Sequence, residues 1–576
     1  LGTYYFESGT DGYVDISNRS SNAGNVVIAD MIRFGNGIGP SGQPREDEAS
    51  LYWIQRHAAP PYAQGISSSE YGTSVVTAAP RYAEFMNRET DGSLSDRVFI
   101  SYHSNAGGGR GVLALHNTNL GGNTPNQILL AQSLAQEVNN DLVAQNGVLD
   151  PDWHNRGTNV LYQNPSFNYG EINNSWINNE FDATIVEVAF HDSIPDSELM
   201  RESYAREAVA RATYQGLIKY FRAVDGNTTP ATELPSTVSG LHATSNASGS
   251  VTLNWLAPVS NSYAGGVATG YRIYASSNGY GFDGGTYFAG GGTSTATLTG
   301  FDPTQPYYFK VVAVNAGGES VGSEVVTVLP SGGEKQVLVV NGFDRLDRSM
   351  NPRQTLPAPN NTVDRVRPLE SNSRDYSVQI GTAIHAAMPG VHVSSASNEA
   401  IISGAVNLND YEAVIWILGE ESTTSSTFNA TEQSKVSAYL NGGGKLFVTG
   451  SEIGWDLDSQ NNGQSFYNNV LRADFVADDA NTYAAIGGAG SIFSGLNLQF
   501  DNGSKFYDVD SPDRISPLNG SIAALSYSGG TGGTAAIQYA GANGQKLVMF
   551  GFPFETITSA NLRRDVMGRV LDFFGV

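Results

Sequence analysis

Two short apolar runs in the first half of the chain each lead into polar side chains. Residues 98–100 are a β-favouring run, and polar residues and a glycine tract follow it: Ser101, His103, Ser104, Asn105 and Gly107–Gly109. Residues 183–190 form a second apolar run that contains one carboxylate, Glu187. The segment between them has helical periodicity, so the pattern predicts a parallel strand–helix–strand unit. Because ligands lie at the carboxyl ends of parallel strands, we expect His103 and Glu187 to face one crevice.

His103 and Glu187 differ in how strongly each indicates a functional site. A lone histidine at the end of a strand is most simply a hydrogen-bonded structural residue. Glu187 says more, because burying a carboxylate without a partner is costly. A bound metal, or a role as general base with a raised pKa, would explain its place in an apolar strand.

Three short motifs resemble one enzyme family. Residues 99–106 (Phe-Ile-Ser-Tyr-His-Ser-Asn-Ala) resemble the S-I-H-x-N-A motif of the zinc-dependent N-acetylmuramoyl-L-alanine amidases. Residues 185–190 (Ile-Val-Glu-Val-Ala-Phe) resemble that family's L-V-E-x-G-F motif, with Ala189 where many members have glycine. Arg156 and Gly157 match the R-G pair that lies between the two motifs. The resemblance covers residues 40–222, and its three motifs occur in the family's order.

The resemblance implies a catalytic domain that holds Zn²⁺ and hydrolyses an amide. It makes His103 a zinc ligand and Glu187 the catalytic residue, while His191 would steady the intermediate or hydrogen-bond at the rim. The family's other histidine ligand belongs to a G-H-G motif, and its glutamate ligand follows that motif. No His-Gly pair occurs in this chain, so we expect both ligands upstream of Leu1. Three residues remain as substitutes within the chain: Glu46, Glu48 and His57.

Composition narrows the class of protein. A length of 576 residues suggests three or four domains, and 66 glycines with 15% charged residues favour strands and loops. The absence of cysteine excludes disulfides, thiol nucleophiles and cysteine–zinc sites. A net charge of −24 argues against a nucleic-acid partner. No apolar run reaches the roughly 18 residues of a membrane span, so we expect no membrane insertion. We expect a secreted, periplasmic or cell-surface protein whose signal peptide lies upstream of Leu1.

The N-terminal half divides into two predicted parts. Residues 1–37 alternate as three strands, and they resemble the last strands of a golvesin-C-terminal-like β-sandwich. Residues 38–223 form the predicted amidase-type α/β/α domain, with its N-terminal part missing. Within it, residues 150–180 read as a polar loop beside the site. Glu171 and Asn173 are the residues of this loop that would line a groove, although a solvated loop is the simpler explanation for both.

A spacer and an all-β domain follow. Residues 224–237 have the composition of a linker. Residues 238–330 then show short alternating strands at regular spacing, which is typical of a β-sandwich. Trp255, Tyr271 and the run 307–314, followed by Asn315-Ala-Gly-Gly, resemble a fibronectin type III domain. We expect it to act as a spacer or adhesive module without chemistry of its own.

The C-terminal part switches to an α/β pattern. Continuous apolar strands alternate with helical segments over residues 334–576, which predicts a doubly wound parallel sheet. The pattern resembles the class I glutamine-amidotransferase-like fold. That family carries a cysteine nucleophile at a sharp turn, where this chain has Gly450-Ser451-Glu452. A serine nucleophile at Ser451 would need a histidine base, so we predict a non-catalytic domain. Asp456 and Asp458 would be candidates for calcium, although their spacing fits no known loop motif.

The chain as a whole is predicted to be a multidomain α/β plus all-β protein, and its resemblance to the zinc amidases implies a cell-wall hydrolase. Its predicted partner is peptidoglycan, in which it would hydrolyse the amide between N-acetylmuramic acid and L-alanine with Zn²⁺. Two alternatives stay open: a secreted wall or polysaccharide binding protein with an inactive amidase scaffold, and another amide hydrolase such as a deacetylase. The sequence does not identify substrate-binding residues or the oligomeric state.

Overall fold

The computed structural model of the chain describes residues 54, 71–86, 96–118, 121–259, 265–331, 336–351, 353–355, 362–364, 366 and 374–576. The strands predicted in residues 1–37 and the substitute ligands Glu46, Glu48 and His57 lie outside this part. The described residues form two compact units. The first takes those up to His103 with Leu113–Gln132 and Leu161–Glu187; the second takes Ser104–Val112, Ser133–Val160 and Val188–Val576.

Four strands make a small sheet in the region of the amidase-like motifs. They are β1 (Val98–Asn105), β2 (Leu113–Leu115), β3 (Leu161–Tyr162) and β4 (Asp182–Phe190), in the order β1-β4-β2-β3. Phe99 near the start of β1 stacks on Phe181, with ring centroids 6.1 Å apart. At the other end, the Asn105 carbonyl accepts a hydrogen bond of 2.9 Å from the His191 amide. The first residues of β1 and β4 lie together, and so do their last residues. The two strands therefore run parallel, as the sequence predicts.

Helices accompany this sheet, and two short ones lie within residues 150–180, where the sequence predicts a loop. In the first unit, α4 (Tyr71–Met86), the 3-10 turn η2 (Gly170–Ile172) and α6 (Asn174–Ile177) pack near one another. Helix α5 (Gln127–Val143) lies between β2 and β3 in the chain. Its apolar stripe, including Leu134, Ala135 and Val138, is fully buried, because those residues recur at helical spacing.

Residues 196–221 have apolar positions at helical spacing, and the structure divides this stretch between two helices rather than one. They are α7 (Ile194–Arg201) and α8 (Ser203–Val224). Glu202 between them has an extended backbone with ψ 123°, and its Oε2 accepts a hydrogen bond of 3.1 Å from the Arg348 amide. The apolar positions continue across the break, so periodicity alone could not reveal the residue at which the backbone turns.

Residues 239–328 form a two-sheet sandwich. One sheet contains β5 (Ser239–Ser245), β6 (Val251–Leu256) and β9 (Thr295–Leu298). The other contains β7 (Gly270–Ser276), β8 (Thr286–Ala289), β10 (Tyr307–Asn315), β11 (Gly318–Glu319) and β12 (Val326–Val328). Trp255 packs on Tyr271 in the core between them, with ring centroids 5.1 Å apart.

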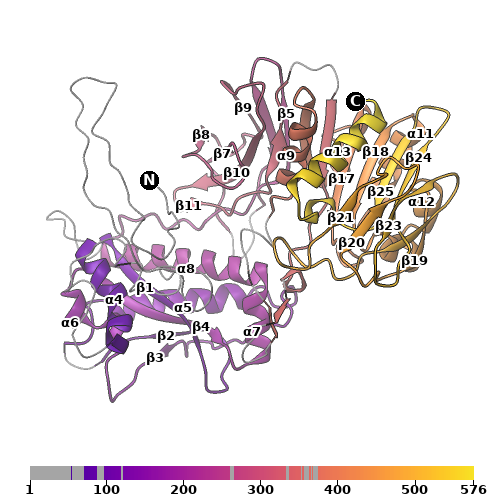
Figure 1. The fold of residues 1–576 in the computed structure, drawn as a ribbon. Helices are drawn as coiled ribbons and strands as arrows, with labels where there is room; N and C mark the ends of the chain where they lie inside the picture. Colours follow the sequence, from indigo (N-terminus) through magenta and orange to yellow (C-terminus); the bar gives the residue numbers. More distant parts are fainter. Residues whose placement is uncertain are drawn as a thin grey trace, which may run out of the picture. The chain divides into compact units, whose positions relative to one another are not determined.

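Figure 1 shows the C-terminal part at the yellow end of its colours, and this part is built on five parallel strands. They are β13 (Gln336–Asn341), β16 (His392–Ser397), β17 (Ala413–Gly419), β18 (Lys445–Gly450) and β25 (Lys546–Phe550), in the order β16-β13-β17-β18-β25. Alternate residues of β13 enter two separate cores, because successive side chains of a strand point to opposite faces. Helices α9 (Ser377–Ala387) and α13 (Ala560–Phe574) bury residues in one core, and α10 (Asn398–Ser403) and α11 (Ala430–Asn441) in the other.

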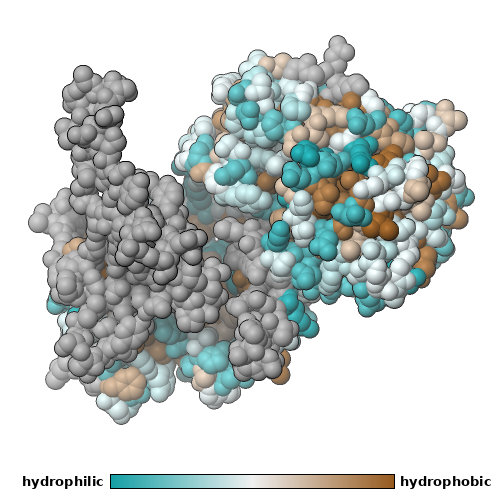
Figure 2. All heavy atoms as spheres, in the orientation of Figure 1, coloured by the Kyte–Doolittle hydropathy of each residue, from teal (hydrophilic) through white to brown (hydrophobic). Residues whose placement is uncertain are grey.

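Antiparallel strands extend this sheet beyond β25. They are β24 (Thr534–Ala540), β23 (Ile522–Tyr527), β20 (Ala484–Gly487) and β21 (Asn497–Gln499). In Figure 2, hydrophilic residues interrupt the hydrophobic ones over the visible face of this part of the second unit. No described helix has both the length and the apolar character to cross a membrane.

The sandwich and the parallel sheet share a strand pairing. Strand β5 of the sandwich pairs antiparallel with β16, Ser395 opposite Ala243 and Ala396 opposite His242. Close by, the Ser395 hydroxyl accepts a hydrogen bond from the Thr327 amide and donates one to the Thr327 carbonyl, both at 2.7 Å. The all-β domain is therefore built into the edge of the C-terminal sheet. The sequence did not reveal this pairing, because the bonding of two strand edges leaves no local pattern.

Candidate functional site

His103 lies beside two polar partners in the first unit. Strand β1 directs Phe99, Ser101 and His103 to the same face, because side chains alternate along a strand. The Ser101 hydroxyl donates a hydrogen bond of 2.6 Å to Glu171 Oε2. His103 Nε2 lies 2.8 Å from the same oxygen, and the two side chains are 40% and 22% exposed. The histidine therefore has a carboxylate partner and remains open to solvent.

The short turn η2 fixes Glu171 at this position. Ile172, the next residue, is fully buried, and its carbonyl accepts a hydrogen bond of 3.0 Å from the Gln127 side chain. Asn173 caps α6 by accepting a hydrogen bond from the Ser175 amide. Of the two residues expected to line a groove, the structure brings Glu171 to His103 and uses Asn173 as a helix cap.

Glu187 occupies the middle of β4, where it pairs with Leu113 of β2. Ala183 and Ile185 of the same strand share a core cluster with Phe99 of β1. Since alternate residues share a face, Glu187 and His103 lie on the same face of the sheet. Tyr169 is close enough to interact with this glutamate: burial raises the pKa of the Tyr169 hydroxyl, and Tyr162 and the Glu187 charge raise it further.

His191 and Asp192 hold the glycine tract that follows β1. Ser104 Oγ lies 3.0 Å from His191 Nδ1. One oxygen of Asp192 accepts hydrogen bonds from the Gly107 and Gly108 amides, at 2.6 and 3.0 Å. These backbone hydrogen bonds lower the pKa of Asp192. Gly107 and Gly108 have φ of 108° and 75°, which only glycine adopts readily. The contacts of His191 are therefore those of a loop anchor.

Asp196 is a buried anchor that sequence reasoning missed. Its carboxylate is fully buried and accepts hydrogen bonds from Arg110 Nε at 2.8 Å and from the Gly111 and Phe190 amides at 2.7 and 3.1 Å. Arg156 reinforces the same place, because its Nε donates to the Arg110 carbonyl at 3.0 Å. An acidic residue in the first turn after Pro195 was the only signal, and such residues are common at helix starts.

The donors at His103 meet part of the requirement for zinc. Imidazole nitrogen and carboxylate oxygen are both usual zinc ligands, and catalytic sites take three protein ligands. His103 and Glu171 supply two such donors that already lie together. Among the described residues, no group of three or more histidine, aspartate or glutamate side chains is arranged to hold a metal. Of the three protein ligands that a catalytic zinc takes, the described residues bring together two donors of a suitable type, His103 and Glu171.

The turn after β18 does not expose Ser451, the residue at the turn where the amidotransferase family has its nucleophile. Ser451 is fully buried, and its amide and hydroxyl both donate to the Gly419 carbonyl, at 2.8 and 3.4 Å. Glu452 is the residue with left-handed backbone, at φ 62°. His392 contacts Ser245, with Nε2 3.2 Å from the hydroxyl. The residue presented by this turn is therefore a glutamate.

Asp456 and Asp458 are structural residues. Asp456 accepts hydrogen bonds from the Thr427 amide and hydroxyl and from Asn462. Asp458 accepts them from two side-chain amides and from the Phe475 amide. Their oxygens are occupied in holding the turn, and the suggestion of a calcium site here is not supported.

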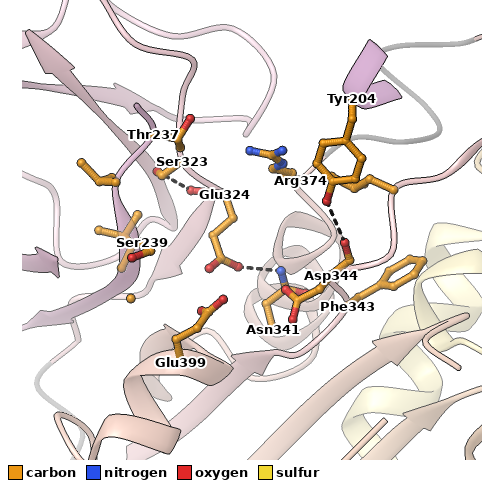
Figure 3. Close-up of a pocket in the computed structure, with 14 residues that line it drawn as sticks. Tyr204, Thr237, Ser239, Ser323, Glu324, Asn341, Phe343, Asp344, Arg374 and Glu399 are labelled. Carbon is orange, nitrogen blue, oxygen red and sulfur yellow. Dashed lines mark hydrogen bonds between the residues drawn. The ribbon is translucent and has the colours of Figure 1, made fainter. Parts of the chain in front are cut away.

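A polar cavity of about 260 Å³ lies in the second unit (Figure 3). Glu324, in the segment between β11 and β12, and Glu399 at the start of α10 both point into it. Glu324 Oε2 accepts a hydrogen bond of 2.6 Å from Asn341 Nδ2. Burial raises the pKa of Glu324 well above its usual value, and the charge of Glu399 adds to the effect. Arg374 and Tyr204 complete the rim.

Comparison with known proteins identifies one part of the chain. The family described as fibronectin type III domain matches residues 236–329, the span of the two-sheet sandwich. Residues 236–329 form a fibronectin type III domain. This confirms the prediction of that domain over residues 238–330.

Solved fibronectin type III domains resemble this stretch. The FN5 domain of Drosophila Lar is 26% identical, covering 17% of this chain and all of that one, with a TM-score of 0.15. The third such domain of the human KIAA0343 protein is 24% identical over 17% of this chain and 86% of its own, with a TM-score of 0.15. No curated protein matches the chain.

Proposed function

We propose that the chain is a zinc-dependent hydrolase of the amide between N-acetylmuramic acid and L-alanine in peptidoglycan. The observation that supports it best is the placement of His103 and Glu187 on one face of two neighbouring parallel strands, with Glu171 against the histidine. A donor pair for a metal and a separate carboxylate on the same face are two of the parts that metal-assisted amide hydrolysis uses.

His103 would hold the zinc through Nε2, and Glu171 is the nearest second donor. Bound zinc supplies a Lewis acid that polarises the amide carbonyl. The Ser101 hydroxyl donates to the Glu171 oxygen that faces the histidine, so it orients that carboxylate. Supporting hydrogen bonds of this kind fix ligand geometry and strengthen metal affinity.

Glu187 serves as the proton carrier in this proposal. It accepts a proton from the attacking water and delivers that proton to the departing alanine amine. Its position in an apolar strand, half-buried beside Tyr169 and on the same face as His103, places it for this role. The anchors Asp192 and Asp196 act only on the loop after β1 and take no part in proton transfer.

A second candidate is a secreted wall-binding protein that keeps an inactive amidase scaffold. The absence of a three-donor group among the described residues favours it. A deacetylase of wall sugars would use similar groups on another amide. In either hydrolytic version, we propose peptidoglycan as the partner, a secreted, periplasmic or cell-surface location, and no nucleic-acid partner or membrane insertion.

The remaining domains would support this activity. Residues 334–576 have the strand order and two-faced helix packing of a doubly wound sheet, so we propose a likeness to class I glutamine-amidotransferase-like domains without their chemistry. The chain has no cysteine, and the turn after β18 buries its serine.

The test is digestion of purified peptidoglycan by the full chain with added zinc, followed by mass spectrometry of the soluble products. Free stem peptides with an L-alanine N-terminus would support the amidase. Released acetate would instead identify a deacetylase. Sedimentation with the wall in the absence of either product would identify a binding protein.

A further inference from the structure

The C-terminal sheet carries a second cavity, of about 300 Å³, that belongs to none of the sites above. It lies beyond the carboxyl ends of three neighbouring parallel strands: Arg345 follows β13, Glu420 follows β17 and Glu452 follows β18. Strand β13 is first in the chain, and the next two parallel strands lie on either side of it. Open α/β sheets bind their ligands at this kind of reversal in strand order.

The lining of the cavity is polar and strongly acidic. Its nine residues are Arg345, Asp347, Glu420, Ser422, Thr424, Ser425, Glu452, Asp510 and Ser511. The single cation is occupied: Arg345 Nε donates to Asp347 at 2.9 Å, and its terminal nitrogens donate to the Glu420 carbonyl and to Ser349. Glu420, Glu452 and Asp510 therefore have no counter-cation of their own in the lining.

Glu420 has an unused acceptor in this cavity. The residue is 5% exposed, and its Oε1 makes no hydrogen bond within the described part of the chain. A buried acceptor without a hydrogen bond destabilises the fold, and more so when the group is charged. A ligand that donates a hydrogen bond here would remove that cost. The neighbouring buried glutamate, Glu421, does not line this cavity, and its Oε2 accepts hydrogen bonds from the Asp344 and Arg345 amides at 2.7 and 2.9 Å.

Glu452 is held toward the cavity by a strained backbone. Its φ of 62° lies in the left-handed region, which is unfavourable for a non-glycine residue. Its Oε2 accepts a hydrogen bond of 2.9 Å from Ser422, another lining residue. Strained residues of this kind concentrate at functional sites, where the surrounding structure enforces them.

The spread of the acceptors selects the chemical class of the ligand. A metal ion needs its carboxylates within about 2.0 to 2.6 Å of one point, and no such group is found among the described residues. Separated acceptors around a polar space instead suit a cation that distributes several N–H donors. The hydroxyls of Ser422, Thr424, Ser425 and Ser511 favour a ligand that is itself polar.

We propose that this cavity binds a small organic cation, a protonated primary amine, with Glu420 and Glu452 as its acceptors. The proposal is independent of the amidase activity, because the cavity shares no residue with the His103 site. Its experiment is calorimetric titration of the full chain with glucosamine and with 1,3-diaminopropane. N-Acetylglucosamine is the neutral control ligand, and calcium chloride is the rival cation.

The matched protein variants are Glu420→Gln, Glu452→Gln and Glu412→Gln. Glu412 is an exposed carboxylate at the opposite end of β17 from Glu420, so its variant changes charge without touching the cavity. We expect saturable binding of at least one amine, at least tenfold weaker in either cavity variant and unchanged in Glu412→Gln. We expect no binding of N-acetylglucosamine.

Proton release gives an independent readout. Burial and the Asp478 charge raise the pKa of Glu452 to about 7, although the Arg345 charge acts to lower it. Glu420, Asp510 and Asp513 are the other charged groups around Glu452. A bound ammonium favours the ionised carboxylate, so titration near pH 6.5 should release protons into the buffer. Absence of saturable amine binding, binding that both cavity variants retain, or calcium binding in place of amine binding would each overturn the proposal.

Discussion

His103 Nε2 lies 2.8 Å from Glu171 Oε2, and the same oxygen accepts the Ser101 hydroxyl at 2.6 Å. Ser101 and His103 of β1 thus both contact one carboxylate oxygen of Glu171, which belongs to a separate segment. The histidine is the residue that the sequence motif marks for zinc, and the glutamate comes from a turn that no motif covers.

This convergence predicts that Glu171 affects metal affinity. His103→Ala should abolish zinc binding, because it removes the motif ligand. Glu171→Gln should weaken binding about tenfold or more, because a neutral amide is a poorer donor than a carboxylate. Competition with a chelator of known affinity measures both. His154→Ala is the control, since His154 is exposed and lies in the other unit. Equal loss in His154→Ala would contradict the assignment.

Asp196 should be a major contributor to stability. Asp196→Asn removes the charge that binds Arg110 and two backbone amides in a fully buried position. Hydrogen bonds to charged groups contribute about 1.5 to 3 kcal/mol, so we expect the free energy of unfolding to fall by about 2 to 3 kcal/mol. Urea unfolding measures the change. Asp192→Asn, at an exposed carboxylate, should have the smaller effect; a reversed order would show that burial does not set the cost.

The C-terminal domain should be more stable in mild acid than in mild alkali. Burial raises the pKa of Glu555 and of Glu421 to about 7, while in the unfolded chain both ionise near the usual value of about 4.3. Their protonated forms are favoured in the fold, so this stability is complete below about pH 4 and is lost as the pH rises through 7.

Thermal unfolding at pH 5.5 and pH 8 tests this dependence. We expect the higher midpoint at pH 5.5, with up to about 2 kcal/mol between the two pH values from a fully buried group such as Glu555. Glu555→Gln keeps an acceptor for the Tyr507 hydroxyl, which donates at 2.6 Å, and removes the titration. The variant should show a smaller difference between the two pH values. An unchanged difference would assign the pH dependence to other groups.

The fibronectin type III domain and the C-terminal sheet should unfold together. Ser395 joins them through two hydrogen bonds of 2.7 Å to Thr327, next to the pairing of β5 with β16. Ser395→Ala leaves the Thr327 amide and carbonyl without this partner, which costs about 1 to 3 kcal/mol. Hydrogen exchange in the Ser395→Ala variant should then be faster in β5 and β16 than in the unchanged protein, without a comparable increase in other strands. Thr252→Ala, at an exposed Thr252–Thr297 contact, is the control and should leave exchange in β16 unchanged.

Much of the architecture was open to prediction, because it depends on local periodicity. The strands that carry His103 and Glu187 follow from apolar runs, and the sandwich follows from regular strand spacing. The sequence does not predict the contact of Glu171 with His103, because the path of that loop depends on the burial of Ile172 in the core. The sequence draws attention to Ser451 in the turn after β18 rather than to Glu452, because only the backbone shows which residue of a turn is left-handed. The β5–β16 pairing joins distant edges and leaves no local signal.

The most direct measurement is the release of stem peptides from purified peptidoglycan by the full chain with zinc, compared with Glu187→Gln. Zinc content of both proteins, measured alongside, shows whether the substitution disturbs the metal site. The proposed mechanism predicts peptides with a free L-alanine N-terminus from the native chain, at least a hundredfold slower release from the variant, and equal zinc in both. Equal release from the two proteins, or no peptide from a zinc-loaded native chain, would contradict it.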